Sequence, residues 1–362
     1  MYHTHGQSPW LDFIDREFME QGELQKLIDA GIRGLTSNPT IFAKAVAEGS
    51  DYDELIARHA ERDASNEAIF EEIAVWDVGD AADMLRPVYD EAGGRDGFAS
   101  IEVEPALAAD TQATLERARH LWRRLARPNV MIKIPATEAG LPAISAATEE
   151  GINVNITLTF SIEMYRRVAR AYLDGLRRRL ARGEDVSRIA SVASFFVSRV
   201  DTKVDKLLDA LGTPSAIALR GRAAIANAKL AYAAYQEIFD GPEFAELRAA
   251  GAGVQRCLWA STSTKNPNYR DVLYVEELIG PDTVDTMPTQ TIADFLDHGR
   301  LERTVDRGVD DARQAIREIE AQGISMETVT AELLDEGIAT FSKSFDELLA
   351  SVDSKRKSLA AA

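Results

Sequence analysis

One lysine of the chain lies inside a run of residues that is otherwise apolar. Residues 130–135 read Val-Met-Ile-Lys-Ile-Pro. Alternate side chains of a strand share a face, so Val130, Ile132 and Ile134 point one way and Lys133 points the other. Removing an ammonium group from water is costly unless the group is paired or neutralised. The pattern predicts either a buried structural ion pair or a lysine retained for chemistry.

Neighbouring apolar runs contain polar residues in comparable places. They supply two carboxylates, Asp12 and Glu102, and an amide with a hydroxyl on one face, Asn155 and Thr157; in a further run, Ser194 and Phe196 share a face. The interior of a barrel is normally filled by branched apolar side chains. Several polar groups that converge from different strands therefore indicate an active site.

These residue types favour imine chemistry on a carbonyl substrate. A desolvated lysine has a lowered pKa and becomes a nucleophilic amine, which attacks a ketone to form a Schiff base. Two carboxylates in different environments supply the acid and the base that imine formation requires. The five histidines lie outside the apolar runs and Cys257 is the only cysteine. We expect no metal site and no cofactor, and we expect Cys257 to be a buried small hydrophobic residue.

The elements that must position these residues alternate along the chain. Eight short runs have strand character, at residues 8–14, 31–37, 98–104, 129–137, 153–159, 189–197, 254–261 and 283–287. Segments with helical spacing follow them, among them residues 23–27, 107–127, 162–181, 202–211 and 215–239. Eight strand–helix units predict an α/β protein, a single (β/α)8 TIM barrel with additional helices. No G-x-G-x-x-G follows the first run, which weakens the alternative of a dinucleotide-binding sheet.

The spacing of the runs is uneven. We expect one barrel domain over residues 1–362, with a helical insertion at 39–97 between the second and third strands. A C-terminal helical extension is expected at 294–362. Both segments are acidic and amphipathic, and we expect them to pack on the barrel exterior.

Composition excludes several functional classes. The 362 residues carry 59 acidic and 41 basic side chains, a net charge of −18, which disfavours nucleic acid and anionic membranes as partners. The N-terminus lacks the apolar core of a secretory signal, and no apolar run is long enough to span a membrane. We expect a cytoplasmic enzyme that acts on small molecules. The sequence leaves a homo-oligomer open.

Three segments resemble the transaldolase family. Residues 36–40 (TSNPT) are similar to its T-x-N-P-[ST] signature, and residues 131–137 (MIKIPAT) resemble its Schiff-base lysine motif. Residues 151–161 (GINVNITLTFS) match its G-I-N-x-N-x-T-L-x-F-S segment. Their order, the chain length and the helical tail resemble the long bacterial branch of the family.

The resemblance implies a (β/α)8 TIM barrel of the class I aldolase type. It also implies a transferase of the pentose phosphate pathway that uses a Schiff base and no cofactor. It would move a dihydroxyacetone unit from sedoheptulose 7-phosphate to glyceraldehyde 3-phosphate, giving erythrose 4-phosphate and fructose 6-phosphate. By motif position, Lys133 would be the nucleophile, Glu102 an acid/base working through a water held by Thr157, and Asp12 the group that exchanges a proton with the substrate hydroxyl. Asn38 and Asn155 would hold the dihydroxyacetone hydroxyls, with Thr36, Ser194 and Phe196 lining the pocket.

The chain departs from the short branch of the family at two places that bear on the phosphate. Residues 194–199 (SFFVSR) lack the proline of its S-P-F-V-x-R pattern, and residues 260–265 (ASTSTK) lack the arginine of its A-S-F-R pattern. Arg199 suits a bidentate phosphate contact, and Ser261, Ser263 and Lys265 are candidates for the rest of the site. The alternatives are a surface Arg199 paired with Asp201 and a solvated loop lysine at 265.

Two other functions fit the same barrel. One is an aldolase that releases dihydroxyacetone from fructose 6-phosphate, but related small aldolases carry tyrosine where this chain has Phe196. The other is a catalytically silent sugar-phosphate-binding barrel, which loss of Lys133 or of either carboxylate would favour. All three residues are present.

Overall fold

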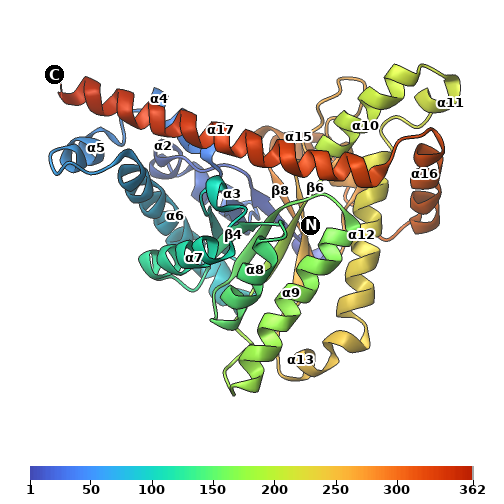
Figure 1. Cartoon of the computed structure of the whole chain (residues 1–362), viewed down its shortest axis with the longest axis horizontal. Helices are drawn as coiled ribbons and strands as arrows, with labels where there is room; N and C mark the ends of the chain where they lie inside the picture. The colour runs from blue at the N-terminus through green and yellow to red at the C-terminus, as the bar shows by residue number, and fades with distance from the viewer. Residues whose placement is uncertain (361–362) are drawn as a thin grey trace.

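Eight parallel strands close into a barrel around which the helices are arranged (Figure 1). The structure is a computed structural model and describes residues 1–360. The strands are β1 (Gln7–Leu11), β2 (Gly34–Thr36), β3 (Phe98–Glu102), β4 (Val130–Pro135), β5 (Val154–Thr159), β6 (Ser191–Phe196), β7 (Gln255–Ala260) and β8 (Thr283–Met287). The strand order is the chain order, and β1 pairs with β8 to close the barrel. The predicted (β/α)8 architecture is confirmed, with most predicted strands one to three residues too long at an end.

The helices fall between the strands and beyond the last one. They are α1 (Tyr2–His5), α2 (Arg16–Glu20), α3 (Glu23–Asp29), α4 (Pro39–Glu48), α5 (Asp53–Ala60), α6 (Asn66–Glu91), α7 (Thr111–Leu125), α8 (Gly140–Glu149), α9 (Ile162–Ala181), α10 (Ser198–Leu211), α11 (Pro214–Ile217), α12 (Ala223–Phe239), α13 (Ala245–Ala249), α14 (Leu273–Glu277), α15 (Thr289–His298), α16 (Val309–Ala321) and α17 (Met326–Ala360). Short 3₁₀ turns lie at Pro105–Leu107 and Pro242–Phe244.

The helix expected at 215–239 is two helices, so that prediction is wrong. The chain leaves α11 after Ile217 and begins α12 at Ala223. Gly221 lies between them with a φ of +70°, a left-handed conformation that ends a helix. Its backbone N–H donates to Asp205, and a Cβ at this position would lie 2.9 Å from the Tyr269 ring. Tertiary contacts therefore break a stretch whose apolar spacing is continuous.

The predicted helical insertion and the predicted C-terminal extension are both helical, but they lie in different places around the barrel. Residues 39–97 hold α4, α5 and α6, and residues 294–360 hold the end of α15, α16 and α17. Figure 1 shows α17 crossing the molecule above the barrel rather than lying along its side. It contacts α4 and α5, and also β5 and α10. The expectation that the tail packs on the barrel exterior is therefore wrong for α17; residues 361–362 lie outside the described part.

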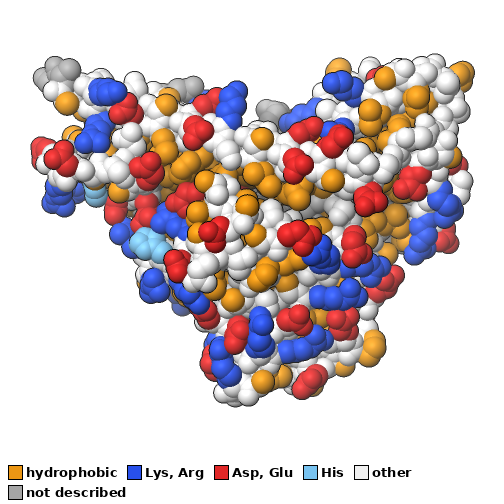
Figure 2. Space-filling view, in the orientation of Figure 1, with side chains coloured by type: hydrophobic (Ala, Val, Ile, Leu, Met, Phe, Trp, Pro, Cys, Tyr) orange, Lys and Arg blue, Asp and Glu red, His pale blue; other side chains and the backbone are white. Residues whose placement is uncertain are grey.

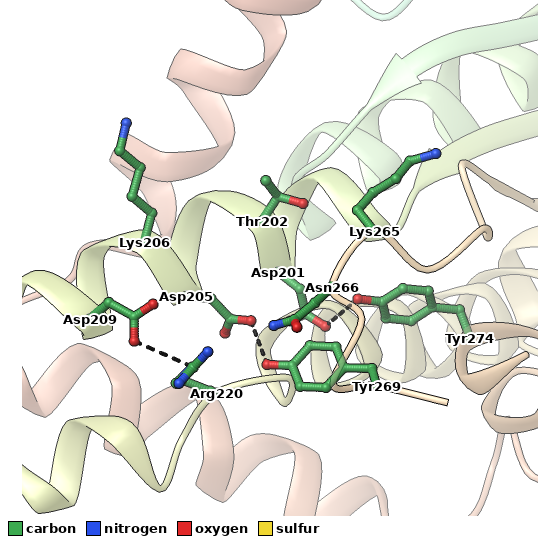
Figure 3. A pocket seen from close by; sticks show the side chains of 10 residues that line it. All are labelled: Asp201, Thr202, Asp205, Lys206, Asp209, Arg220, Lys265, Asn266, Tyr269 and Tyr274. Carbon is green, nitrogen blue, oxygen red and sulfur yellow. Dashed lines mark hydrogen bonds and ion pairs between the residues drawn. The ribbon is translucent and has the colours of Figure 1, made fainter. Parts of the chain in front are cut away.

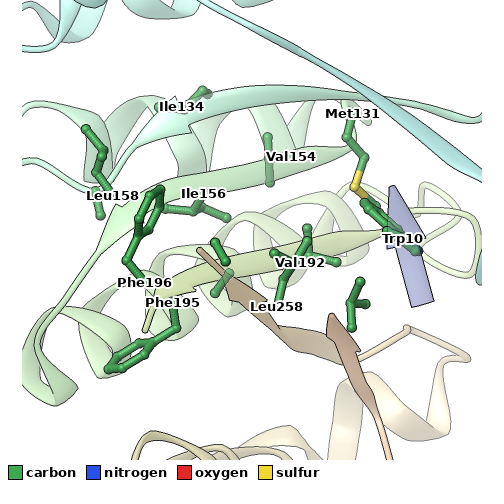
Figure 4. Close-up of a cluster of buried hydrophobic side chains, with 14 of the residues drawn as sticks. Trp10, Met131, Ile134, Val154, Ile156, Leu158, Val192, Phe195, Phe196 and Leu258 are labelled. Carbon is green, nitrogen blue, oxygen red and sulfur yellow. The ribbon is translucent and has the colours of Figure 1, made fainter. Parts of the chain in front are cut away.

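Apolar side chains fill the lower part of the barrel interior. Met131 extends toward Trp10, with Val192 and Leu258 nearby (Figure 4). Trp10 is fully buried and packs on the backbone of Gly34, where a Cβ would lie only 2.5 Å from the indole. Glycine is required there because any side chain would displace the tryptophan. This packed layer forms a floor beneath the polar residues.

Charged side chains are distributed over the outer surface. Figure 2 shows acidic and basic groups interspersed on the face it displays. In residues 1–360 no helix combines the length and the apolar character that crossing a membrane requires.

Candidate active site

A cavity of about 310 Å³ opens at the carboxyl ends of the strands. This is the end where barrel enzymes place their active sites. Eleven residues predicted from the sequence line it: Asp12, Thr36, Asn38, Lys133, Thr157, Ser194, Phe196, Arg199, Ser261, Ser263 and Lys265. The cavity therefore draws together residues from seven strands or the loops that follow them.

Lys133 is buried at the base of this cavity. Its Nζ donates a hydrogen bond to the Ser37 carbonyl at 3.1 Å and lies 3.3 Å from Oε2 of Glu102. Lys133 and Glu102 are register partners on β4 and β3, so strand pairing itself places them together. Burial raises the pKa of Glu102, and the positive charge of Lys133 opposes that rise. Among the described residues, Glu102 is the carboxylate within ion-pair distance of Lys133.

Glu102 does not line the main cavity. It borders a separate void of about 20 Å³ together with Ser37, Asn38 and apolar side chains. A void of that size holds about one water molecule. The carboxylate therefore lies between the lysine amine and a place suited to a single water.

Asp12 lies on the wall formed by the first strand. Its Oδ1 accepts a hydrogen bond from Thr36 Oγ1 at 2.7 Å, and that hydroxyl lies 2.9 Å from Thr286 Oγ1 on β8. Burial raises the pKa of Asp12, and the positive charges of Lys133, Lys265 and Arg199 oppose the rise. A carboxyl group in this setting is suited to exchange a proton with a substrate bound at the lysine.

The amide of Asn155 belongs to a polar layer beneath the cavity. Asn155 is fully buried and is the register partner of Lys133 on β5. Its Nδ2 donates to Ser100 Oγ at 3.1 Å, and its Oδ1 accepts from Ser194 Oγ at 2.7 Å. Only part of its hydrogen-bonding capacity remains for a ligand, and it does not line the main cavity.

Two other predicted residues keep polar atoms free within the described part of the chain. Thr157 is fully buried and its Oγ1 has no hydrogen-bond partner there. Asn38 uses its Oδ1 to cap α4, accepting from the Ile41 N–H at 3.2 Å, which leaves its Nδ2 for another acceptor. Unpaired buried polar atoms in a cavity wall are costly, and a ligand or water would satisfy them.

Arg199 lies at the opposite side of the cavity, between two aromatic rings. Its guanidinium carbon is 5.2 Å from the centre of the Phe196 ring and 5.9 Å from that of Phe341. Burial lowers its pKa, an effect that Asp12 and Glu336 oppose. The alternative pairing with Asp201 is wrong, because Asp201 accepts from the Ala224 N–H and the Tyr274 hydroxyl. Among the described residues no carboxylate lies within ion-pair distance of Arg199.

The loop after β7 places the other predicted anion ligands beside Arg199. Ser261 Oγ lies 2.9 Å from Ser198 Oγ, and Lys265 Nζ donates to Ser263 Oγ at 2.7 Å. Two tyrosine–aspartate hydrogen bonds tie this loop to α10: Tyr269 to Asp205 at 2.6 Å and Tyr274 to Asp201 at 2.8 Å.

A second pocket, of about 280 Å³, lies beside these ties and shares Lys265 with the cavity. Figure 3 shows the Lys265 side chain directed away from the tyrosine–aspartate pairs. The anchored loop thus holds Lys265 at a fixed place relative to the helix that carries Arg199.

Sequence reasoning missed the residues that α17 contributes. Thr340 and Phe341 line the cavity, as do Thr40, Ile41, Ala260, Thr286 and Pro288. β8 reads Thr-Val-Asp-Thr-Met, so no apolar run sets Thr286 apart as a site residue. Nothing in the local sequence of α17 signals that its face covers the barrel mouth. The helix supplies one aromatic wall of the Arg199 site.

Metal-binding side chains do not cluster in the described part of the chain. No group of three or more His, Cys, Asp or Glu residues there is arranged to hold an ion. Cys257 is fully buried, with its Sγ 3.5 Å from the Tyr165 hydroxyl, and burial raises its pKa to about 12. The expectation that Cys257 is a buried small residue is confirmed.

Comparison with known proteins places the chain in one family. A family model described as Transaldolase/Fructose-6-phosphate aldolase matches residues 9–352. The chain belongs to the transaldolase/fructose-6-phosphate aldolase family. The match extends through the barrel and most of α17, so the helix over the barrel mouth is within the part that the family model covers.

Curated relatives narrow the family to one of its two named activities. A protein named transaldolase from Thermobifida fusca is 51% identical over 346 residues, covering 95% of this chain and 94% of the relative. Transaldolases from Mycobacterium ulcerans and Mycobacterium tuberculosis H37Rv are 48% and 49% identical, covering 98% and 95% of this chain and 96% and 93% of the relatives. Identity at this level over nearly the whole chain supports transaldolase function. None of these three relatives is named a fructose-6-phosphate aldolase.

Proposed function

We propose that the chain transfers a dihydroxyacetone unit between sugar phosphates through a Schiff base on Lys133. The observation that carries this proposal is the buried Lys133 amine, 3.3 Å from Glu102 in a cavity that also contains Asp12. An amine, an acid and a second carboxyl group from three strands are what imine formation and C–C cleavage require. The proposed donor is sedoheptulose 7-phosphate and the proposed acceptor is glyceraldehyde 3-phosphate.

The first half of the reaction forms the imine. The unprotonated Lys133 amine attacks the ketone carbon of the donor, and a proton passes from the nitrogen to the carbonyl oxygen to give a carbinolamine. That hydroxyl then leaves as water, with a proton supplied from Glu102 through a water molecule. The proposed site of that water is the hydroxyl of Thr157, which lines the main cavity and has no hydrogen-bond partner among the described residues.

The second half breaks and remakes a carbon–carbon bond. Asp12 removes the proton from the hydroxyl at C4, the C3–C4 bonding electrons move into the protonated imine, and erythrose 4-phosphate leaves as the aldehyde. The enamine left on Lys133 attacks the acceptor aldehyde, whose oxygen recovers the proton from Asp12. Hydrolysis of the new imine releases fructose 6-phosphate and returns the lysine. Asp12, Glu102 and Lys133 each end the cycle in the protonation state in which they began. The proposed reaction involves no net oxidation or reduction, so it needs no cofactor.

Substrate binding divides between the two ends of the cavity. In this proposal the Nδ2 group of Asn38 faces the dihydroxyacetone hydroxyls, and Asn155, whose Nδ2 also donates to Ser100, offers its remaining N–H from beneath the cavity. Thr36 orients Asp12, and Ser194 orients Asn155. The phosphate takes the place between Arg199 and the loop of Ser261, Ser263 and Lys265. A dianion there would supply the partner that Arg199 lacks. We keep the cytoplasm as the proposed location, since phosphorylated sugars do not cross membranes unaided.

Phe196 separates the proposed activity from its aldolase alternative. Its ring packs against Phe160, with ring centres 5.2 Å apart, and it faces the cavity without a hydroxyl. A phenyl group neither orients water nor donates a proton, so the enamine is left for an aldehyde acceptor. The test is a coupled assay with fructose 6-phosphate and erythrose 4-phosphate. Transfer should greatly exceed release of free dihydroxyacetone; release that equals transfer would favour the aldolase.

A further inference from the structure

Leu158 has a backbone conformation that bulky residues rarely adopt. Its φ is +58°, and its side chain is 2% exposed. A left-handed conformation is freely available to glycine but strained for a residue with a Cβ. Such strain persists where the surrounding structure enforces it, and it is common at functional sites. Leu158 follows Thr157 directly at the end of β5.

The strand pairing is irregular at the same place. Ile156 pairs with Ala193 of β6, but Thr159 pairs with Phe195, so three steps along β5 match two along β6. An extra residue of this kind forms a bulge, which redirects neighbouring side chains. Thr157 lies inside the bulge, and its buried, unpaired Oγ1 belongs to the cavity wall.

A glycine of α17 contacts the bulge from above. Gly337 lies within a helix of 35 residues, where glycine is less favourable than alanine. A Cβ at Gly337 would lie 2.9 Å from Leu158 Cδ2, closer than side chains normally approach. The missing side chain lets α17 pack directly on Leu158. The helix and the bulge therefore fit each other at this one point.

We propose that Leu158 is a positioning residue whose left-handed backbone, covered by Gly337 of α17, holds the free hydroxyl of Thr157 in the cavity. The inference rests on the proposed function, in which Thr157 holds the water used during imine formation. It assigns a catalytic consequence to the helix that crosses the barrel mouth. Leu158 itself touches no substrate in this account.

Substitutions at Leu158 separate this role from simple packing. Glycine accepts the left-handed backbone but loses the whole side chain. Alanine loses most of the side chain and disfavours the left-handed backbone. Valine keeps most of the apolar volume, but its branched side chain disfavours the left-handed backbone most. If Leu158 acts by positioning Thr157, Leu158→Gly should be the most active of the three variants, Leu158→Ala intermediate and Leu158→Val the least active. Packing alone predicts the reverse order.

The experiment measures kcat and KM for fructose 6-phosphate and the rate of imine trapping by borohydride, on variants whose folding is checked by thermal unfolding. Leu158→Val should lower kcat and the trapping rate about 10- to 100-fold with KM changed little, as expected for a misplaced catalytic group. Thr157→Val should give the same pattern and sets the reference. Activity that follows the packing order, or a loss confined to KM, would overturn the positioning role.

A double-variant cycle tests the contribution of α17. Gly337→Ala should lower kcat about twofold or more in the parent, and this further loss should disappear in the Leu158→Gly background, where no side chain meets the new methyl group. Gly79→Ala, a mid-helix glycine of α6 whose Cβ would face the Arg127 side chain, controls for the change in helix propensity. Equal effects of Gly337→Ala in both backgrounds, or no effect in either, would remove α17 from the account.

The outcome for this inference is distinguishable from that of the proposed function. A parent enzyme that traps no imine would overturn the proposed function and this inference with it. A parent that traps imine while the Leu158 variants follow the packing order would overturn the inference alone.

Discussion

Lys133 and Glu102 face each other across one register position of β4 and β3, with Nζ 3.3 Å from Oε2. Their separation is fixed by backbone pairing rather than by loops, so it does not depend on a flexible segment. Each group offsets the cost of burying the other. Removing the Glu102 carboxylate should therefore alter the reactivity of the Lys133 amine directly. Removing the carboxylate of Asp12, which lies beyond ion-pair distance of Lys133, should affect a later step of the reaction.

The two carboxylates are expected to act at different steps. Glu102→Gln keeps the shape but removes proton transfer, so it should slow both imine formation and turnover, by about 10²–10⁴-fold. Asp12→Asn should reduce turnover while imine accumulates, because C–C cleavage lacks its base. Borohydride trapping on a short time course separates the two results. If both variants trap imine as fast as the parent, the role given to Glu102 is wrong.

Arg199 is expected to hold the substrate phosphate. Arg199→Ala should raise KM for phosphorylated donors about 10- to 100-fold, corresponding to loss of a charged hydrogen bond of about 1.5–3 kcal/mol. Lys265→Ala should have a smaller effect of the same kind, because that side chain is exposed. Neither variant should block borohydride trapping at saturating donor.

A matched control for the phosphate variants is Lys206→Ala. Lys206 is an exposed cation on α10 that lies in the pocket of Figure 3 but does not line the cavity. Its KM should stay within about twofold of the parent value. An unchanged KM in Arg199→Ala would place the phosphate elsewhere, and an equal rise in all three variants would indicate a general loss of positive potential.

Asp285 is expected to make stability depend on pH. It is fully buried on β8, its Oδ1 accepts from Thr262 Oγ1 at 2.8 Å, and burial raises its pKa to about 7. The folded state therefore holds this proton more tightly than the unfolded state does. The resulting stabilisation is complete below about pH 4 and is lost as pH rises to 7, by up to about 1.4 kcal/mol per pH unit.

The variant Asp285→Asn tests this dependence because it cannot ionise. The Tm of the variant minus that of the parent should increase between pH 5.5 and pH 8, since the loss of stability caused by ionising residue 285 occurs only in the parent. The hydrogen bond from Thr262 is kept in the variant by the amide oxygen. The same difference in Tm at both pH values would show that Asp285 does not titrate there.

Sequence patterns were sufficient for the barrel and for most of the cavity wall. Lys133 and Thr157 stand out because a polar side chain within an apolar strand needs a reason, and strand alternation gives its direction. The same rule does not single out Thr286, because three of the five residues of β8 are polar. It did not reveal that Asn155 is largely committed to Ser100 and Ser194, because hydrogen-bond partners on other strands depend on register.

Contacts between distant segments account for what the sequence did not predict. The apolar face of α17 is visible in its spacing, but spacing does not say which surface that face covers, so the positions of Phe341 and Gly337 were missed. The break between α11 and α12 depends on Asp205 and Tyr269, both outside that segment. Local patterns identify elements and directions, and tertiary packing decides where helices end and what they cover.

The central claim is that Lys133 forms the imine, and peptide mass spectrometry after borohydride reduction tests it most directly. The enzyme is incubated with fructose 6-phosphate, reduced, digested and compared with Lys133→Ala and with the exposed control Lys206→Ala. The account predicts a reduced dihydroxyacetone adduct on the peptide that contains Lys133, in the parent and in Lys206→Ala, and neither adduct nor turnover in Lys133→Ala. An adduct on another lysine, or full turnover in Lys133→Ala, would contradict it.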